Sequence, residues 1–210
     1  MQTSTERKKM KIAHLASILT VLILTACAAH VTKPESEFNP PPASTFNHYK
    51  NFELLPVNEQ KGCDKQHGAD TLFAKLNSQL SVQLAPKLAN WSTQKSSGAE
   101  TLVIEPVCTN ARLIGVAARI FTGPFSGSSV IVLSVRYTER STGKVIAEPV
   151  FYQRAAAGSG GFTFGTMDQI MMSRMTKLIT DYTVNNYSTA VGGRTGLEKE
   201  DVATKDTPAS

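Results

Sequence analysis

The sequence predicts an α+β fold in which a single mixed β-sheet of about four or five strands carries two helices on one face. Two segments have apolar residues at steps of three and four, as one face of a helix does. Residues 129–138 instead alternate between two faces, as a strand does. The elements follow in the order β-α-β-β-β-α, and a helix between the first two strands favours a right-handed parallel crossover.

The first predicted strand covers residues 49–57, which are rich in aromatic and aliphatic side chains and end near Pro56. We expect a helix next, with Asp70 as its N-cap and a kink at Pro86, because proline removes a backbone donor from a helix. The apolar face of this helix is formed by Phe73, Leu76, Leu80, Leu84, Leu88 and Trp91.

Two further strands are predicted at residues 101–108 and 129–138. Pro106 lies inside the first of them, and because proline cannot donate to a β-ladder, we expect an edge strand or a bulge there. The second is the clearest strand of the chain. One of its faces holds Ile131, Leu133, Val135 and Tyr137, and the other holds Val130, Val132, Ser134 and Arg136.

A hairpin and a second helix complete the predicted domain. Gly143 lies where a short hairpin loop needs a positive φ, and residues 145–153 return antiparallel, weakened at their centre by Pro149. Thr166 and Gln169 then have the spacing of a capping box. The apolar stripe of the helix is Ile170, Met171, Met175, Leu178, Ile179 and Tyr182.

The first 26 residues have the pattern of a secretory signal peptide. An apolar run at residues 12–24 is shorter than the ~20 residues that a membrane-spanning helix needs. It follows a basic start that contains Arg7, Lys8, Lys9 and Lys11 against the single acid Glu6.

The end of this segment, Leu24, Thr25, Ala26 and Cys27, resembles the lipobox of bacterial lipoproteins. The resemblance implies cleavage before Cys27 and attachment of fatty chains such as palmitate to it. Ala28 stands where aspartate would resemble an inner-membrane retention signal, which favours the outer membrane, with the domain facing the periplasm. The alternatives are a secreted protein cut after Ala26 or Ala28, with Cys27 unmodified, and an uncleaved anchor.

Composition predicts a single domain between two unstructured segments. We expect Cys27 and a Pro-rich tether at residues 27–45, the α+β domain at 46–188 and a disordered tail at 189–210. Because Pro-rich chains extend by about 3.1 Å per residue, such a tether would lift the domain up to ~55 Å off the membrane. A domain of this length is large enough for one core.

The net charge excludes nucleic acid as a partner. The whole chain carries +5, but the leader holds four of the 22 basic residues and one of the 17 acids, which leaves 18 against 16. No basic cluster interleaved with aromatic residues is present in the sequence, so it has no electrostatic footprint for a polyanion.

Cys63 and Cys108 form an even pair once Cys27 carries lipid, and outside the cytoplasm a disulfide is expected. Two free buried thiols are the alternative. Cys63 also lies near Asp64, His67 and Asp70, a group that could be drawn as a metal site or a Cys/His pair. We reject both, because a disulfide supplies no thiolate and the group lacks a second histidine at ligand spacing.

Three features, taken together, resemble a group of small Gram-negative envelope lipoproteins. They are the strand Leu-Val-Ile-Glu-Pro-Val at residues 102–107, the Gly-rich apolar stretch after it, and the hairpin Thr-Gly-Lys-Val-Ile-Ala-Glu at 142–148. This group is related in architecture to auxiliary lipoproteins of ABC-type transport systems. The resemblance implies a mixed sheet with helices on one side, tethered to a membrane and acting through contacts, and it carries over no catalytic residues.

Two Gly-rich loops hold the candidate partner-contact residues. Phe121 and Phe125 lie in residues 115–127, and Phe162 and Phe164 lie in residues 158–165. The second loop lacks the spacing of a nucleotide-binding loop, because Thr163 stands where a GxGxxG pattern needs glycine. We expect the four phenylalanines to meet a protein partner. The alternative is that they fold back to cap the ends of the sheet.

We therefore expect a non-enzymatic envelope lipoprotein, an accessory or assembly subunit, with no cofactor, no metal and no nucleotide. Neither a GxSxG nor an HExxH pattern occurs in the sequence. The membrane, through the lipid anchor, and an envelope protein complex are its expected partners. The alternative is a binding module for a lipid or another amphiphile, in which the methionine-rich residues 167–175 would line a cavity between helix and sheet.

Overall fold

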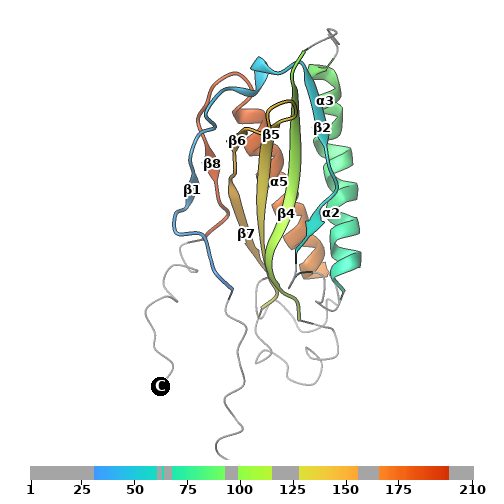
Figure 1. Ribbon diagram of the computed structural model, residues 1–210. Helices are drawn as coiled ribbons and strands as arrows, with labels where there is room; N and C mark the ends of the chain where they lie inside the picture. The colour runs from blue at the N-terminus through green and yellow to red at the C-terminus, as the bar shows by residue number, and fades with distance from the viewer. Residues whose placement is uncertain are drawn as a thin grey trace, which may run out of the picture. The chain divides into compact units, whose positions relative to one another are not determined.

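The computed structural model describes residues 31–60, 63, 68–92, 99–114, 128–155 and 166–198, all within the unit Val31–Ser210. They form a six-stranded mixed sheet with helices on one face, which confirms the predicted fold class (Figure 1). Its strands are β2 (Asn51–Leu54), β3 (Asn58–Glu59), β4 (Thr101–Arg112), β5 (Val130–Glu139), β6 (Val145–Ala147) and β7 (Val150–Arg154).

The pairing of the strands is parallel on one side of β4 and antiparallel on the other. β2 and β3 both run parallel to β4, so the predicted parallel pairing across the first helix is confirmed. β5 pairs antiparallel with β4, and β6 and β7 both pair antiparallel with β5. The sheet therefore places the two longest strands, β4 and β5, at its centre.

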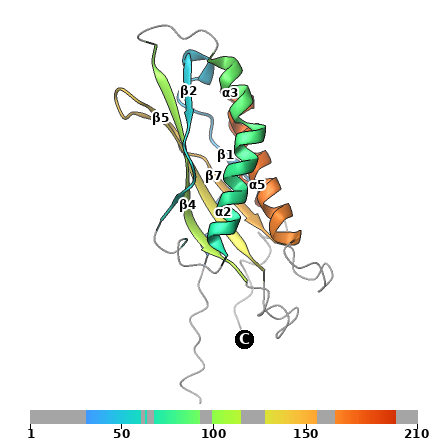
Figure 2. The ribbon, with the colours of Figure 1, turned by 90° about the vertical axis from the view of Figure 1, so that its right-hand side faces the viewer.

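The helices cover one face of this sheet, as Figure 2 shows. They are α2 (Ala69–Gln83), α3 (Ala85–Trp91) and α5 (Thr166–Asn185). The helix that we expected to kink at Pro86 is divided into α2 and α3 at Leu84, with Pro86 in the first turn of α3, where a missing N–H costs least. No helix in the described ranges is long and apolar enough to cross a membrane.

The predicted cap of the first helix is wrong. Gly68, with φ of 81°, stands at the N-cap, and Asp70 lies in the first turn, where a carboxylate is favourable near the positive end of the helix dipole. Only glycine adopts this left-handed conformation without strain. α5 begins at Thr166, whose side chain lies outside the described residues, so the capping box stays a prediction.

The apolar faces predicted for the helices and for β5 meet in one core. Ile131, Leu133, Val135 and Tyr137 are fully buried against helix residues that include Leu76. The stripe on α5 is corrected at one position, because Ile170 is 39% exposed and Met172 is fully buried. The other predicted helix residues are buried or partly buried against the core: Phe73, Leu80, Leu84, Leu88, Trp91, Met171, Met175, Leu178, Ile179 and Tyr182.

Pro106 lies in a central strand, not in the edge strand that we expected. Its neighbour on one side is interrupted there, because β2 ends opposite Ile104 and β3 begins opposite Val107. A proline is tolerated because no continuous partner strand faces it at this gap. The bulge of β4 lies further along, between Cys108 and Asn110.

The hairpin is as predicted. Gly143 has φ of 71° in the turn between β5 and β6, and the returning strand is divided around Pro149 into β6 and β7. The backbone N–H of Val135 donates to the Pro149 carbonyl at 2.9 Å, which keeps the ladder continuous across the division.

The domain is wider at both ends than the expected boundaries, 46 and 188. β1 (Phe38–Asn39) pairs antiparallel with β8 (Gly193–Arg194), in segments that we assigned to the tether and to the disordered tail. The Asn39 side-chain amide donates to the Val150 carbonyl and accepts from the Val150 N–H, and the side-chain Oδ1 of Asn186 accepts from the N–H groups of Val191 and Gly192. These side-chain hydrogen bonds hold the two segments on the domain. The segments lack the long apolar pattern that usually predicts an ordered element.

Candidate functional site

The roots of the two Gly/Phe loops lie together at one end of the main sheet. The Ser129 hydroxyl accepts a hydrogen bond from the Ile114 N–H at 3.0 Å, and the Ser129 carbonyl accepts one from the Ala155 N–H at 2.9 Å. Ile114 and Ser128 flank the first loop, and Ala155 precedes the second. One buried serine thus ties both roots to the start of β5.

The strand register explains this convergence. Arg112, the last residue of β4, and Arg154, the last residue of β7, both pair with Val130, the first residue of β5. β4 and β7 therefore end, and β5 begins, at the same edge of the sheet. We call this end, formed by Arg112, Ser129 and Ala155, the loop end. The opposite end, formed by residues 136–148 and the residues that pair with them, we call the hairpin end.

The polar atoms of the loop end are only partly satisfied within the described ranges. Arg112 Nη2 donates to the Ser128 carbonyl at 3.3 Å. Arg112 Nε and Ser128 Oγ are buried and have no hydrogen-bond partner in this part of the chain. A buried polar atom without a partner costs free energy.

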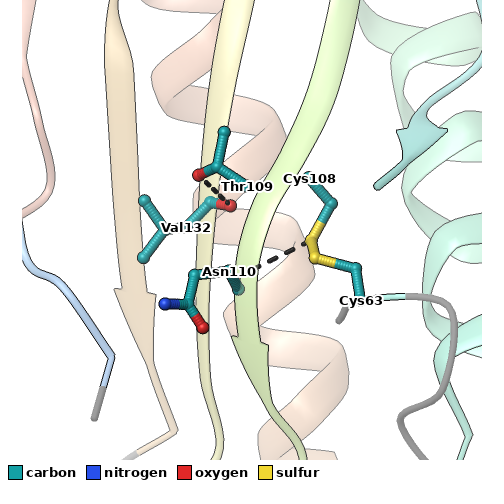
Figure 3. Close-up of a disulfide and its surroundings, with 5 residues drawn as sticks. All are labelled: Cys63, Cys108, Thr109, Asn110 and Val132. Atoms are coloured by element: carbon teal, nitrogen blue, oxygen red, sulfur yellow. Dashed lines mark hydrogen bonds between the residues drawn. A yellow bond between two sulfur atoms is a disulfide. The ribbon is translucent and has the colours of Figure 1, made fainter. Parts of the chain in front are cut away.

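The predicted disulfide between Cys63 and Cys108 is present, and it closes a separation of 45 residues (Figure 3). Both cysteines are buried, and Cys108 Sγ lies 3.7 Å from the Asn110 carbonyl oxygen at the bulge of β4. Thr109 Oγ1 donates to the Val132 carbonyl at 3.3 Å across the same bulge. The disulfide therefore attaches the segment before α2 to β4.

The metal or nucleophile alternative at Cys63 gains no support. Cys63 is oxidised, and Asp70 is an exposed residue of the first turn of α2. Asp64 and His67 lie outside the described residues. Cys27, Phe121, Phe125, Phe162 and Phe164 also lie outside them, so lipidation and the aromatic contacts stay predictions.

The methionines expected to line a cavity are core residues wherever their side chains are described. Met171, Met172 and Met175 are fully buried in the same hydrophobic cluster as the sheet. Thr176 on the same helix donates to the Gln79 side chain at 3.0 Å, which joins α5 to α2. The side chain of Met167 is not among those described.

On the face of the sheet opposite the helices lie the first and the last of the described segments. Val130, Val132, Tyr152 and Leu197 form a small buried cluster, and Val31, the first described residue, packs against it. The Tyr152 N–H donates to the Thr195 carbonyl at 2.8 Å. Val31 therefore lies near the start of β5, at the loop end.

The hairpin end carries paired charges that the sequence did not reveal. Glu105 and Arg136 are directly opposite in the β4–β5 register, and Arg136 bridges Glu105 at 3.7 Å and Glu148 at 3.2 Å. Arg140 pairs with Glu53. These ion pairs depend on the register between strands that are far apart in the sequence, so composition alone could not predict them.

Tyrosine hydroxyls join this end to the core. Tyr49 donates to Glu139 Oε1 at 2.9 Å, and burial raises its pKa to about 12. Burial also raises the pKa of Tyr137 well above its ordinary value. The Tyr137 hydroxyl donates to Thr183 Oγ1 at 2.6 Å, because the single hydroxyl proton of Thr183 is already given to the Ile179 carbonyl. Both tyrosines stay neutral at physiological pH.

Searches among family models and curated proteins find no match to the chain. Solved structures similar to part of the chain include the following three. The PelC dodecamer from Paraburkholderia phytofirmans is 11% identical, over 64% of this chain and 89% of that one, with a TM-score of 0.34. The hypothetical protein CT253 from Chlamydia trachomatis is 15% identical, over 65% and 99%, with a TM-score of 0.35. A "putative lipoprotein" from Caulobacter crescentus is 12% identical, over 66% and 89%, with a TM-score of 0.32.

Proposed function

We propose that this protein is a lipid-anchored protein of the cell envelope, acylated at Cys27, that acts through protein contacts and not as an enzyme. The observation that carries the proposal is the pair of hydrogen bonds at Ser129, which gives the two Gly/Phe loops a common base. Two loops with a common base can present their side chains to one partner at the same time.

The anchor is supported by the position of Cys27 and by the oxidised cysteine pair. Cys27 follows a basic start and an apolar run in the sequence, where a lipobox cysteine stands. Cys63 and Cys108 are joined in the structure, as suits a compartment outside the cytoplasm. Acylation with two or three chains would hold the protein almost permanently on a membrane. The alanine after Cys27 favours the outer membrane, with the domain in the periplasm.

The contact surface is proposed from the composition of the loops. Residues 115–127 and 156–165 hold four phenylalanines, a single charged residue, Arg119, and no acid. Aromatic residues are enriched and acidic residues depleted in the centres of protein interfaces. Phe121, Phe125, Phe162 and Phe164 are therefore the residues that we propose to contact the partner, as part of an accessory or assembly subunit.

Site-specific photocrosslinking in intact cells tests this function. A photoreactive residue replaces Phe121 in one variant, Phe162 in a second and Lys144, at the hairpin end, in a third. We expect the first two variants to capture the same protein and the third not to capture it. Capture of no protein from either loop, or equal capture from Lys144, would contradict the proposal.

A matched set of substitutions separates contact from stability. Replacing the four loop phenylalanines by serine should abolish capture and leave the midpoint of denaturant unfolding unchanged, since the proposal assigns these side chains to the partner and not to the core. Loss of capture together with a large loss of stability would instead support the alternative in which these side chains cap the sheet.

A further inference from the structure

We infer that the loop end of the sheet rests on the surface of the lipid bilayer that holds the acyl chains, while the hairpin end points away from it. The inference rests on the proposed acylation of Cys27 and adds to it an orientation. Two observations carry it: the number of residues between Cys27 and the domain, and the place where the chain joins the domain.

The free tether is much shorter than the Pro-rich composition suggested. Val31 already packs on the cluster of Val130, Val132, Tyr152 and Leu197, and the chain from there to β1 lies on the domain. Only residues 28–30 separate Val31 from Cys27 in the sequence. Four steps between consecutive Cα atoms span at most about 14 Å, against the ~55 Å of an eighteen-residue tether.

The tether joins the domain at one end of the long strands. The cluster on which Val31 packs contains Val130 and Val132, both within the first three residues of β5, whereas the hairpin turn follows Glu139, the last residue. A strand of this length spans about 33 Å. The hairpin end therefore lies about 30 Å farther from the tether than the loop end does, and the short tether brings the loop end to the bilayer first.

The chemistry of the two ends fits this orientation. At the loop end, Ile170, in the second turn of α5, exposes 39% of its surface. An exposed aliphatic side chain suits the boundary between headgroups and acyl chains. At the hairpin end, carboxylates pair with Arg136 and Arg140 at the surface, where water solvates them.

Two positions on the described surface report the orientation. Gln169 is exposed in the first turn of α5, and Lys144 is exposed in the hairpin turn. The chain just after α5 lies toward the hairpin end, because the ring of Tyr187 lies near that of Phe52, Phe52 pairs with Leu102, and Leu102 pairs with Glu139. Gln169 precedes Asn185, the last residue of α5, by 16 residues, and a helix of that length spans about 24 Å toward the loop end.

The experiment measures quenching of a fluorophore on Gln169→Cys or Lys144→Cys. The acylated full mature chain is reconstituted in protein-free vesicles of phosphatidylethanolamine and phosphatidylglycerol that contain a headgroup nitroxide lipid. The disulfide leaves Cys63 and Cys108 unreactive toward the label. We expect the label at position 169 to be quenched several-fold more than the label at position 144. Equal quenching, or stronger quenching at 144, would overturn the orientation.

A change of tether length supplies the control. A Gly/Ser insertion of about twenty residues between His30 and Val31 should remove most of the quenching at position 169, because a flexible chain of that length lets the domain leave the surface. The same insertion after Glu198 should leave the quenching unchanged. Undiminished quenching with the long tether would show that tether length does not set the orientation.

The intact mass of each sample separates the two proposals. Protein without acyl chains would overturn the proposed anchor. Acylated, vesicle-bound protein with equal quenching at the two positions would overturn the orientation alone. A membrane-facing loop end also means that a partner captured from Phe121 or Phe162 must itself lie at the bilayer surface.

Discussion

The two ends of the main sheet differ in how their polar groups are satisfied. At the hairpin end, Arg136 bridges Glu105 and Glu148, and the turn closes with a hydrogen bond from the Glu139 N–H to the Lys144 carbonyl. At the loop end, Ser129 binds both loop roots, but Arg112 Nε and Ser128 Oγ stay unpaired among the described residues. The charges toward the hairpin end pair with one another, and the loop end is where we expect contacts with other molecules.

The largest expected effect lies near the loop end. Removing the disulfide in Cys63→Ala/Cys108→Ala should lower the free energy of unfolding by about 4 kcal/mol, because the cross-link closes a long loop in the unfolded chain. Urea unfolding of the soluble domain measures it, with reductant added to the wild type as a second route to the same state. A loss below about 1 kcal/mol would mean that the link contributes little to this end.

The next effect tests whether the C-terminal segment belongs to the domain. Leu197 is 5% exposed in the cluster that covers the face opposite the helices, so Leu197→Ala should cost about 2 to 3 kcal/mol. Val191→Ala is the matched control, since Val191 is 59% exposed and its replacement should cost less than about 0.5 kcal/mol. Equal costs in urea unfolding would show that residues 189–198 do not stabilise the fold.

A smaller effect is expected at two serines, Ser129, which immediately precedes β5, and Ser134, which lies within it. Ser129→Ala leaves the Ile114 N–H without its acceptor and should cost about 1 to 2 kcal/mol. Ser134→Ala removes a hydroxyl that donates to Glu148, a partly exposed carboxylate that water can solvate, and should cost less than about 1 kcal/mol. Hydrogen exchange should also show faster exchange at Ile114 in the first variant only.

The smallest effect is a pKa shift at the hairpin end. The hydrogen bond from the Ser141 hydroxyl, followed by the bond from the Ser141 N–H, lowers the pKa of the Glu100 carboxyl. Because the folded-state pKa is depressed, its contribution to stability is present above the unfolded-state pKa and is lost as pH falls through the folded-state value. Ser141→Ala should raise the Glu100 pKa toward its ordinary value in an NMR titration. An unchanged pKa would show that the hydroxyl is not the main cause.

The elements with regular apolar spacing could be predicted from the sequence. The faces of β5 and of the two long helices follow from periods of two and of three to four, because burial on one side selects those positions. Gly143 and Pro149 located the turn and the division of the returning strand, since both act on the local backbone.

The elements that depend on distant partners could not be predicted. β1 and β8 have two residues each, too few to show a period. Their pairing joins Phe38 to Arg194, which lie near opposite ends of the domain's sequence. The side chains of Asn39 and Asn186 fix these segments through backbone hydrogen bonds, a role that composition does not distinguish from a loop. The expected long tether was wrong for the same reason.

Only part of the candidate site could be predicted from the sequence. The two Gly/Phe loops are recognisable by composition, but the role of Ser129 depends on the register that places Arg112 and Arg154 opposite Val130. Register follows from the pairing of three strands, of which the hairpin fixes only two.

The intact mass of the protein extracted from membranes tests the proposed anchor most directly. We predict a chain that begins at Cys27 and is heavier than its amino-acid mass by the weight of its fatty acyl groups. A chain with the leader attached, or a mature chain whose Cys27 thiol is unmodified, would contradict both the anchor and the orientation that depends on it.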